Sequence, residues 1–303
     1  MKRFLIFVIL NFLVIFTVMA QPKDACFYLQ TASNAYCENN FKKMVKPLSA
    51  FLEKYPSHAL EEEALYARAF AYYKMKKNKA AIADFKNLLS LENYNVTDSF
   101  GMHFFDCNLL INQCRNILIP EMLINLQHEG AIILFEIYFA SKKWDEARDY
   151  LYAAKERYRL WHGCGTGDLD ADMRLATLHS RLLNAQNKKD SALLVLLPYT
   201  LEAAAFPMQY YKALITEANK LLKEQFSQVE IEELLWQAVE SLYYSSHESH
   251  RHGESRIYYI RMLDVIIKVS PDYLFQHNYN EYQVKDYIKN TEFFRLLSLS
   301  TTE

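Results

Sequence analysis

The sequence predicts an all-α fold, a solenoid of antiparallel helix pairs, and three observations support it. One spacing of small and large apolar residues recurs along the chain. The 303 residues include only six Gly and seven Pro against 51% hydrophobic residues, which leaves few residues for the many turns of an all-β fold. No strong alternation of apolar and polar residues predicts strands.

The recurring pattern has five positions, which we call repeat positions 1 to 5. Positions 1 to 3 share one face of a helix. The nine residues from position 3 to position 4 are enough for that helix to end and for an antiparallel partner to begin. The copies are Leu65, Ala69, Tyr72, Ala81 and Phe85; Ala131, Phe135, Tyr138, Ala147 and Leu151; and Ala176, Ser180, Leu183, Ala192 and Leu196.

The best copy reads Leu65-x-x-Arg68-Ala69-x-x-Tyr72 with Ala81-x-x-x-Phe85, where the small residues allow a neighbouring helix to approach closely. This pattern resembles the tetratricopeptide repeat (TPR) family, whose repeats span roughly 34 residues. The resemblance covers residues 41–198. It implies a binding scaffold, and no catalytic residue carries over because the family signature is a packing signature.

Some residues depart from the family pattern. Arg68 and His179 stand where the family prefers Leu, Phe135 occupies a small-residue position, and Asn93 replaces the closing Pro of the best copy. Before that copy, residues 48–56 resemble the closing helix and terminal proline of a preceding half-copy. Pro56 is expected to end that helix.

The N-terminus predicts a cleavable secretory signal peptide over residues 1–20. Lys2 and Arg3 precede an apolar run, and Val18-Met19-Ala20 presents residues that a signal peptidase could accept before Gln21. We therefore expect a secreted protein, periplasmic or in the cell envelope if bacterial, with no stable membrane span after cleavage. The mature chain would carry 32 basic and 36 acidic side chains, a balance that argues against nucleic acid as a partner.

We divide the mature chain into TPR-like repeats over 21–200 and a helical C-terminal extension over 201–303. An inserted Gly/Asp loop is expected at about 161–172. Ser227 and Glu230 have the spacing of a capping box. The helices expected in the extension span 210–224, 227–244, 257–269, which ends before Pro271, and 283–297. The last is expected to cover the apolar end of the solenoid, with Phe293 and Phe294 in the core.

The inserted loop is the first candidate for a local site, because loops inserted into repeats often contact ligands. The interpretation we favour makes Asp168 a helix N-cap, with Asp170 and Asp172 in the first turn. A calcium loop formed by these three carboxylates is an alternative. Cys164 beside His162 is a second alternative, as a thiol nucleophile with its base. The candidate contact residues in this loop are Trp161, His162, Cys164, Asp168 and Asp170.

Cysteine and histidine give two further hypotheses. The five cysteines are an odd set, so internal pairing leaves one over, and residues seven or eleven apart on one helix are too distant for a disulfide. Any disulfide is therefore expected to join different helices. His247, His250 and His252 could bind zinc or copper if they lie on a helix that unwinds at Gly253. A solvated polar turn explains the same residues without a metal.

Two functions remain open. The first is a secreted, non-enzymatic protein- or peptide-binding module without a cofactor, whose repeat surface is rich in tyrosines such as Tyr66 and Tyr73. The alternative is a metal-dependent or thiol hydrolase that uses the 162–172 loop on a helical scaffold. Replacing Cys164 or Asp168 should abolish the activity of such an enzyme, whereas a scaffold should tolerate either change.

Overall fold

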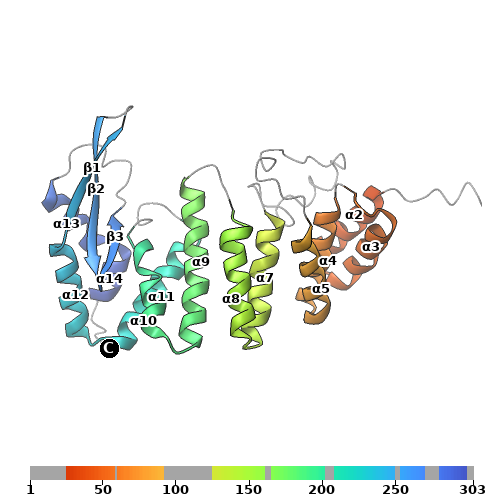
Figure 1. Cartoon of the computed structure of the whole chain (residues 1–303), viewed down its shortest axis with the longest axis horizontal. Coiled ribbons are helices and arrows are strands. Elements are labelled where there is room, and N and C mark those ends of the chain that lie inside the picture. Colours follow the sequence, from red (N-terminus) through yellow and green to blue (C-terminus); the bar gives the residue numbers. More distant parts are fainter. Residues whose placement is uncertain are drawn as a thin grey trace, which may run out of the picture. The chain divides into compact units, whose positions relative to one another are not determined.

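The computed structural model describes residues 25–58, 60–91, 125–160, 165–201, 208–249, 253–269 and 280–298. The chain divides into two compact units, residues 1–130 and residues 131–303. The described residues form twelve α-helices and one three-stranded antiparallel sheet (Figure 1). The predicted helical character is therefore confirmed, and the sheet is a departure from the all-α prediction. The predicted signal peptide lies outside the described residues.

The first unit is built from consecutive helices that pack on one another. Each of them contacts the next one along the chain, and Met44, Leu48 and Phe51 are fully buried between them. The boundary between the units falls within the following helix, α7 (Leu126–Ala140). The helices of the first unit are α2 (Ala25–Cys37), α3 (Phe41–Lys54), α4 (Glu61–Lys74) and α5 (Asn78–Ser90).

The second unit continues with helices and adds the sheet. A π-helical turn (Ala153–Arg157) follows α8, and a 3₁₀ turn (Leu197–Tyr199) follows α10. One hydrophobic core joins residues from Met173 to Leu297. The elements after α7 are α8 (Trp144–Tyr152), α9 (Gly165–Ala185), α10 (Lys189–Leu194), α11 (Tyr211–Gln225), α12 (Gln228–Glu240), β1 (Tyr243–Ser249), β2 (Gly253–Met262), β3 (Val265–Val269), α13 (Glu281–Asn290) and α14 (Glu292–Ser298).

One turn geometry closes four helix pairs, α2–α3, α4–α5, α7–α8 and α9–α10. In the second pair, the Lys76 N–H donates to the Tyr73 carbonyl at 2.8 Å and the Lys77 N–H to the Tyr72 carbonyl at 2.9 Å. These bonds satisfy carbonyls that a helix end leaves open. The second residue after the first helix has a left-handed backbone in every pair, with φ of 54° at Asn39, 58° at Lys76, 55° at Lys142 and 61° at Asn187.

The shared turn confirms the spacing between repeat positions 3 and 4. The position 3 carbonyl accepts a hydrogen bond from the fifth residue after it in all four pairs, and every residue at positions 4 and 5 is at most 4% exposed. The α2–α3 pair is therefore a full copy, which the sequence interpretation took for a half-copy. The sequence interpretation did not compare the first helix of this pair, α2, with the repeat pattern. The residues of this copy are Tyr28, Ala32, Ala35, Met44 and Leu48.

The prediction of a helix over residues 257–269 is wrong, because these residues form β2 and β3. Burial alternates along β2, where Tyr258, Ile260 and Met262 are at most 5% exposed and pair with β3. The hairpin turns at Leu263 and Asp264, whose φ values are 48° and 62°. Two central residues with positive φ suit a two-residue hairpin. Apolar residues with a period of two were mistaken for a helical stripe.

The other C-terminal helices agree better with expectation. Ser227 and Glu230 form the expected capping box at the start of α12, but α12 ends at Glu240 because β1 begins at Tyr243. The helix expected over 283–297 is two helices, α13 and α14, separated at Thr291, which has an extended backbone. Phe293 and Phe294 are 0% and 3% exposed, so their prediction as core residues is confirmed.

Both described cysteines are disulfide-bonded. Cys26 and Cys37 lie near the two ends of α2, about 16 Å apart at about 1.5 Å per residue. Because a disulfide spans less than about 7 Å between Cα atoms, neither bond joins Cys26 to Cys37. Cys107, Cys114 and Cys164 lie outside the described residues. In the described part of the chain, no helix has the length and apolar content needed to cross a bilayer.

Candidate binding surfaces

A buried ion pair fixes the helices of the first unit. The Arg68 guanidinium on α4 donates to both carboxylate oxygens of Asp84 on α5, at 2.7 and 2.8 Å, and to Ser49 Oγ on α3 at 3.3 Å. The two charged side chains are 19% and 9% exposed. Arg68 occupies a place where the TPR pattern has Leu, so a two-point ion pair replaces apolar packing there.

The first unit also presents a group of half-buried rings that we call the aromatic surface. The Phe70 ring lies 6.2 Å from Tyr66, 6.5 Å from Tyr73, and 6.2 Å from both Tyr36 and Phe41, measured between ring centroids. The candidate residues Tyr66 and Tyr73 therefore belong to one cluster around Phe70. The aromatic surface comprises Tyr36, Phe41, Tyr66, Phe70 and Tyr73.

The aromatic surface suits apolar and cationic groups. The Lys74 ammonium lies 5.1 Å from the Phe70 ring centroid, a distance at which the ring face attracts a cation. Burial raises the pKa of Tyr36 above its ordinary value of 10.0, so its hydroxyl stays protonated at neutral pH. Half-buried Tyr and Phe rings offer contact area at low entropy cost.

An acidic side chain lies on the same helical stripe. Glu63 precedes Tyr66 by three residues and Phe70 by seven on α4, so the three share one face. Burial raises the pKa of Glu63 to about 7, and its buried Oε2 has no hydrogen-bond partner among the described residues. The charge of this carboxyl therefore changes close to neutral pH.

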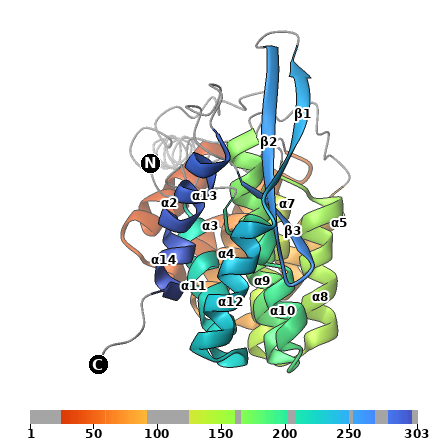
Figure 2. The same ribbon diagram turned by 90° about the vertical axis from the view of Figure 1, so that its left-hand side faces the viewer.

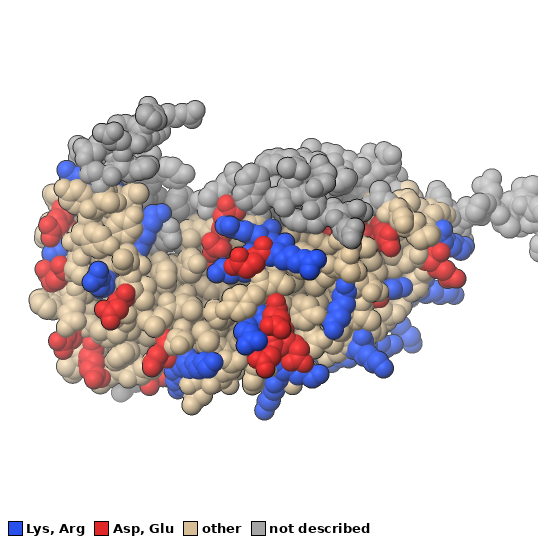
Figure 3. Space-filling view, in the orientation of Figure 1, with Lys and Arg blue, Asp and Glu red and all other residues tan. Residues whose placement is uncertain are grey.

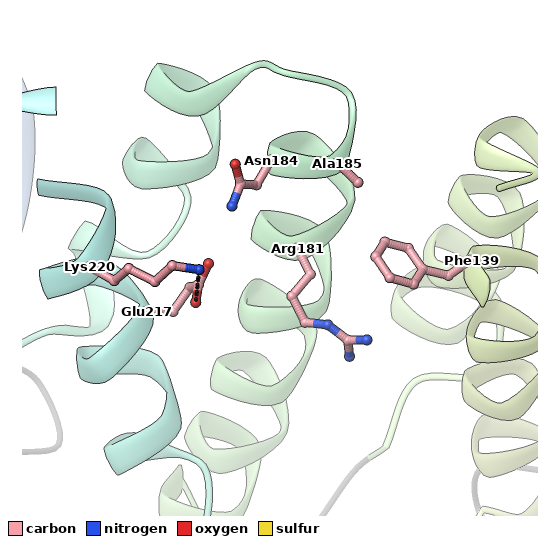
Figure 4. A pocket seen from close by; sticks show the side chains of 6 residues that line it. All are labelled: Phe139, Arg181, Asn184, Ala185, Glu217 and Lys220. Carbon is pink, nitrogen blue, oxygen red and sulfur yellow. Dashed lines mark ion pairs between the residues drawn. The ribbon is translucent and has the colours of Figure 1, made fainter. Parts of the chain in front are cut away.

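The second unit contains an open depression of about 420 Å³. Its lining comes from three helices, α7, α9 and α11 (Figure 4). We call it the α9 depression, because α9 supplies half of its residues. The lining residues are Phe139, Arg181, Asn184, Ala185, Glu217 and Lys220.

Arg181 is held at the wall of the α9 depression by α7. Its guanidinium donates to both carboxylate oxygens of Glu136, at 2.8 and 3.2 Å, and lies 4.9 Å from the Phe139 ring centroid. The Arg181 and Glu136 side chains are 37% and 30% exposed. Two partners orient this guanidinium while leaving part of it in contact with solvent.

The opposite wall carries a weaker pair. The Lys220 ammonium lies 3.9 Å from a carboxylate oxygen of Glu217 on α11, the ion pair dashed in Figure 4. The Asn184 side chain, drawn in the same view, adds an amide that can both donate and accept. The α9 depression thus combines one ring, one amide and charges of both signs, which suits an extended polypeptide with polar side chains.

Sequence reasoning missed the α9 depression, although the repeat alignment contains the signal. Glu136 and Arg181 each follow repeat position 2, and Phe139 and Asn184 each follow position 3. In the first unit, Phe70 and Tyr73 occupy the same two places. In the copies that begin with α4, α7 and α9, the residues that follow positions 2 and 3 are therefore half-buried and reach the surface.

The predicted inserted loop is mostly helical. Because α9 begins at Gly165, Asp168 lies in the first turn and not at the N-cap, which corrects the capping prediction. The Asp170 carboxylate accepts a hydrogen bond from the Tyr210 N–H at 3.1 Å, so it ties α9 to the start of α11. Trp161, His162 and Cys164 lie outside the described residues, and their roles stay predictions.

The helix also removes the basis of the calcium alternative. Residues two apart on an α-helix are separated by about 200° around the axis, so Asp168 and Asp170 cannot face one ion as they would in a calcium loop. Within the described ranges, no group of three His, Cys, Asp or Glu side chains is arranged to hold a metal. Of the three carboxylates, only Asp168 lies in the first turn of α9, where the helix dipole favours it. Asp170 and Asp172 lie in the second turn, so their predicted place in the first turn is wrong.

The histidine hypothesis is tested only at His247. This residue lies in β1, opposite Ser255 of β2, so the helical face on which the metal site was predicted does not form there. His250 and His252 lie outside the described residues. A metal site at these histidines stays a prediction without its helical basis.

The charges on the described surface are mixed. On the face drawn in Figure 3, Lys and Arg side chains are interspersed with Asp and Glu. Such a surface differs from the clustered basic patch that a phosphate backbone attracts. Comparison of the chain with protein-family models, with curated proteins and with solved structures finds no match in any of the three.

Proposed function

We propose that the chain is a secreted, non-enzymatic module with a TPR-like solenoid architecture that binds a protein or peptide segment. The observation that carries the proposal is that residues at equivalent places in the repeat form both surfaces. In the copies that begin with α4, α7 and α9, the residues after repeat positions 2 and 3 are half-buried, while positions 1, 2, 4 and 5 are buried. A repeat scaffold that holds a ligand is expected to use such variable positions beside an invariant packing pattern.

Each surface supplies part of the recognition. The aromatic surface offers rings for apolar or cationic side chains of the ligand. The α9 depression offers an oriented guanidinium, an amide and a carboxylate for polar side chains and for backbone groups. The partner is therefore expected to be a polypeptide segment that carries both apolar and charged residues.

The disulfides support a secreted location. Bonded cysteines persist in oxidising compartments such as the periplasm or the extracellular space, and both described cysteines are bonded. This agrees with the signal peptide predicted over residues 1–20. Within the described part of the chain, no observation favours the hydrolase alternative, because the carboxylates assigned to it are helical.

Site-specific photo-crosslinking in the native extract tests the proposal. A photoreactive phenylalanine analogue is placed at Tyr73, at Asn184, or at the exposed control position Ser191 on α10. We expect one discrete protein adduct from the first two positions and none from Ser191. Equal adducts from all three positions, or an adduct from Ser191 alone, would contradict the proposal.

A point variant then connects the adduct to the geometry. Phe139→Ala removes the ring beneath Arg181 and should reduce the adduct formed at position 184 about tenfold, because a buried aromatic contact is typical of binding hot spots. Tyr152→Ala, at an exposed aromatic of the same unit, serves as the matched control and should leave the adduct unchanged. Circular dichroism confirms that both variants are folded.

A further inference from the structure

The outer face of α12 is the most exposed apolar feature of the described chain. Val229 and Trp236 are 74% and 65% exposed, while Ile231 and Leu235 on the opposite face are at most 7% exposed. Val229, Glu232, Glu233, Trp236 and Glu240 follow helical spacing on one exposed face. An exposed Trp is unusual for a surface without a partner.

The helices beside α12 add to the same surface. Figure 2 shows α12, α13 and α14 together in the half of the view toward the reader, and each contacts the other two. Tyr282 on α13 is 79% exposed and Leu296 on α14 is 36% exposed. The three helices carry seven acidic and three basic side chains. The surface is therefore apolar at its anchors and acidic between them.

The glutamates on the outer face of α12, Glu232, Glu233 and Glu240, form what we call the acidic stripe. Within the described part of the chain, one of them is already paired with a lysine and the other two are not. The Lys285 ammonium on α13 lies 3.0 Å from carboxylate oxygens of both Glu240 and Glu281. Glu232 and Glu233, one turn or more before Glu240, accept hydrogen bonds from Gln228 and Gln237. No basic side chain of the described ranges pairs with either carboxylate. The two carboxylates that precede Trp236 in the stripe therefore lack a basic partner among the described residues.

One described stretch of the first unit carries the opposite charge. Residues 25–91 contain ten basic and six acidic side chains, a net charge of +4. Lys42, Lys43 and Lys46 form an exposed stripe on α3. Lys43 pairs with Glu38 at 3.2 Å, and no described carboxylate pairs with Lys42 or Lys46. Every copy of the chain therefore carries a basic stripe and an acidic one.

We propose that the α12 surface of one copy docks on the α3 lysine stripe of a second copy. The two stripes match over one helical turn. Lys42 and Lys43 precede Lys46 by four and three residues, and Glu232 and Glu233 precede Trp236 by the same intervals. With the helices side by side and parallel, the first pair of lysines meets the two carboxylates while the Lys46 ammonium lies over the indole ring.

The charges also favour a contact between two different surfaces over a symmetric contact between the copies. A symmetric contact between two α12 faces would bring Glu232 and Glu233 of both copies together, and like charges at an interface are unfavourable. The proposed contact is instead heterologous, because it joins two different surfaces. The area is small and the ion pairs are exposed, so we expect weak association that salt reduces further.

Sedimentation velocity of the purified protein over about 10 to 500 μM tests the proposal. We expect a sedimentation coefficient that rises with concentration at low salt and rises less at 0.5 M NaCl. Trp236→Ala should weaken association about tenfold or more. Tyr152→Ala, at another exposed aromatic of the second unit, should leave it unchanged. Single sedimenting monomers at every concentration and salt level would overturn the proposal.

A charge swap makes the test specific. The E232K/E233K chain and the K42E/K46E chain should each stay monomeric alone, because in each chain the net charges of the two stripes then have the same sign. Mixing the two should restore association, since each now complements the other. If E232K/E233K instead associates more strongly than the natural chain, the contact is between like α12 faces and the proposal is wrong. Thermal unfolding of each variant confirms that all are folded.

Discussion

The aromatic surface of the first unit and the α9 depression of the second use the same repeat positions for different chemistry. After positions 2 and 3, the first unit has Phe70 and Tyr73, whereas the second has Arg181 and Asn184. The packing positions change in size, from Ala69 to Phe135 at position 2, but keep the same spacing in both units. The comparison indicates that the repeat constrains the spacing of the interior residues and leaves the neighbouring positions free to vary.

The arginine–carboxylate ion pairs of the two units differ in how far they are exposed to solvent. Arg68 and Asp84 in the first unit are 19% and 9% exposed, so breaking the pair leaves a buried charge. Arg181 and Glu136 in the second unit are 37% and 30% exposed, so water can replace either partner. The first pair contributes to stability, and the second leaves part of a guanidinium in contact with solvent.

Reduction of the disulfides should give the largest difference in stability between the two units. Both described disulfide-bonded cysteines lie on α2 of the first unit. Closing a loop of many tens of residues stabilises by about 4 kcal/mol per bond in the chain-entropy account. We expect a reductant to expose amides of α2 and α3 to hydrogen exchange before those of α11 and α12. Simultaneous exposure of both units would contradict this difference.

The disulfides themselves can be mapped by mass spectrometry. Digestion without reduction should place Cys26 and Cys37 in two separate linkages, because α2 holds them too far apart to join. With five cysteines in the chain, one should remain open to alkylation. A single peptide that links Cys26 to Cys37 would show that α2 is not a continuous helix.

Arg68→Ala should destabilise the protein by about 3 kcal/mol, because it leaves the buried Asp84 carboxylate without its partner. Arg181→Ala should cost less than about 1 kcal/mol, because its pair is half-exposed. Urea unfolding measures both. The double variant R68L/D84L is the control and should recover most of the loss, because it removes both charges together. Equal losses for the two single variants would remove the distinction between the pairs.

Glu63 gives the first unit a pH dependence of stability near neutral pH. Burial raises its pKa from 4.5 to about 7 in the folded state, so the folded state holds the proton more tightly than the unfolded state. The contribution to stability is full below pH 4.5 and is lost as pH rises through 7. Glu63→Gln should therefore raise stability at pH 8 by about 2 kcal/mol.

The same measurement at pH 4 should show little gain for Glu63→Gln, because both forms are then neutral. Glu53→Gln changes an exposed carboxylate on α3 and serves as the control at both values of pH. Chemical denaturation across this range gives the comparison directly. A gain that is equal at pH 4 and pH 8 would mean that ionisation of Glu63 is not its cause.

The smallest expected effect concerns repeat position 2 in the second unit. Ser180 is fully buried and its Oγ has no hydrogen-bond partner among the described residues. Ser180→Ala should stabilise by about 0.5 to 1 kcal/mol, because it removes a buried hydroxyl without a partner. Ser180→Leu should destabilise by about 1 to 3 kcal/mol, because a larger side chain would separate the packed helices. Thermal unfolding compares the two, and a loss in the alanine variant would indicate a hidden partner for Oγ.

The sequence predicted the helix pairs because their signal is periodic and local. Positions such as Ala69, Ala81 and Phe85 repeat at fixed spacing and are all buried. The four turns carried no such signal. Lys76 and Lys142 adopt a left-handed backbone that is more typical of Gly, so residue type alone did not show that the turns are alike.

The sheet and the binding surfaces were missed for different reasons. In β2, the apolar residues Ile257, Tyr258, Ile260 and Met262 fit a helical stripe as well as a strand, so the period was ambiguous. The α9 depression combines residues 139 to 220, and no shared residue type marks them. Only the alignment of the repeats shows that these positions are equivalent. We applied that alignment to the packing residues alone.

The shared turn also has a kinetic consequence. Each helix pair is closed by hydrogen bonds between residues three and five apart in sequence, as at Lys142 and Lys143. Contacts of such short sequence separation form quickly, and they do not need distant parts of the chain. A chain that emerges progressively from a narrow channel could therefore close each helix pair as it appears, before the next pair has left the channel.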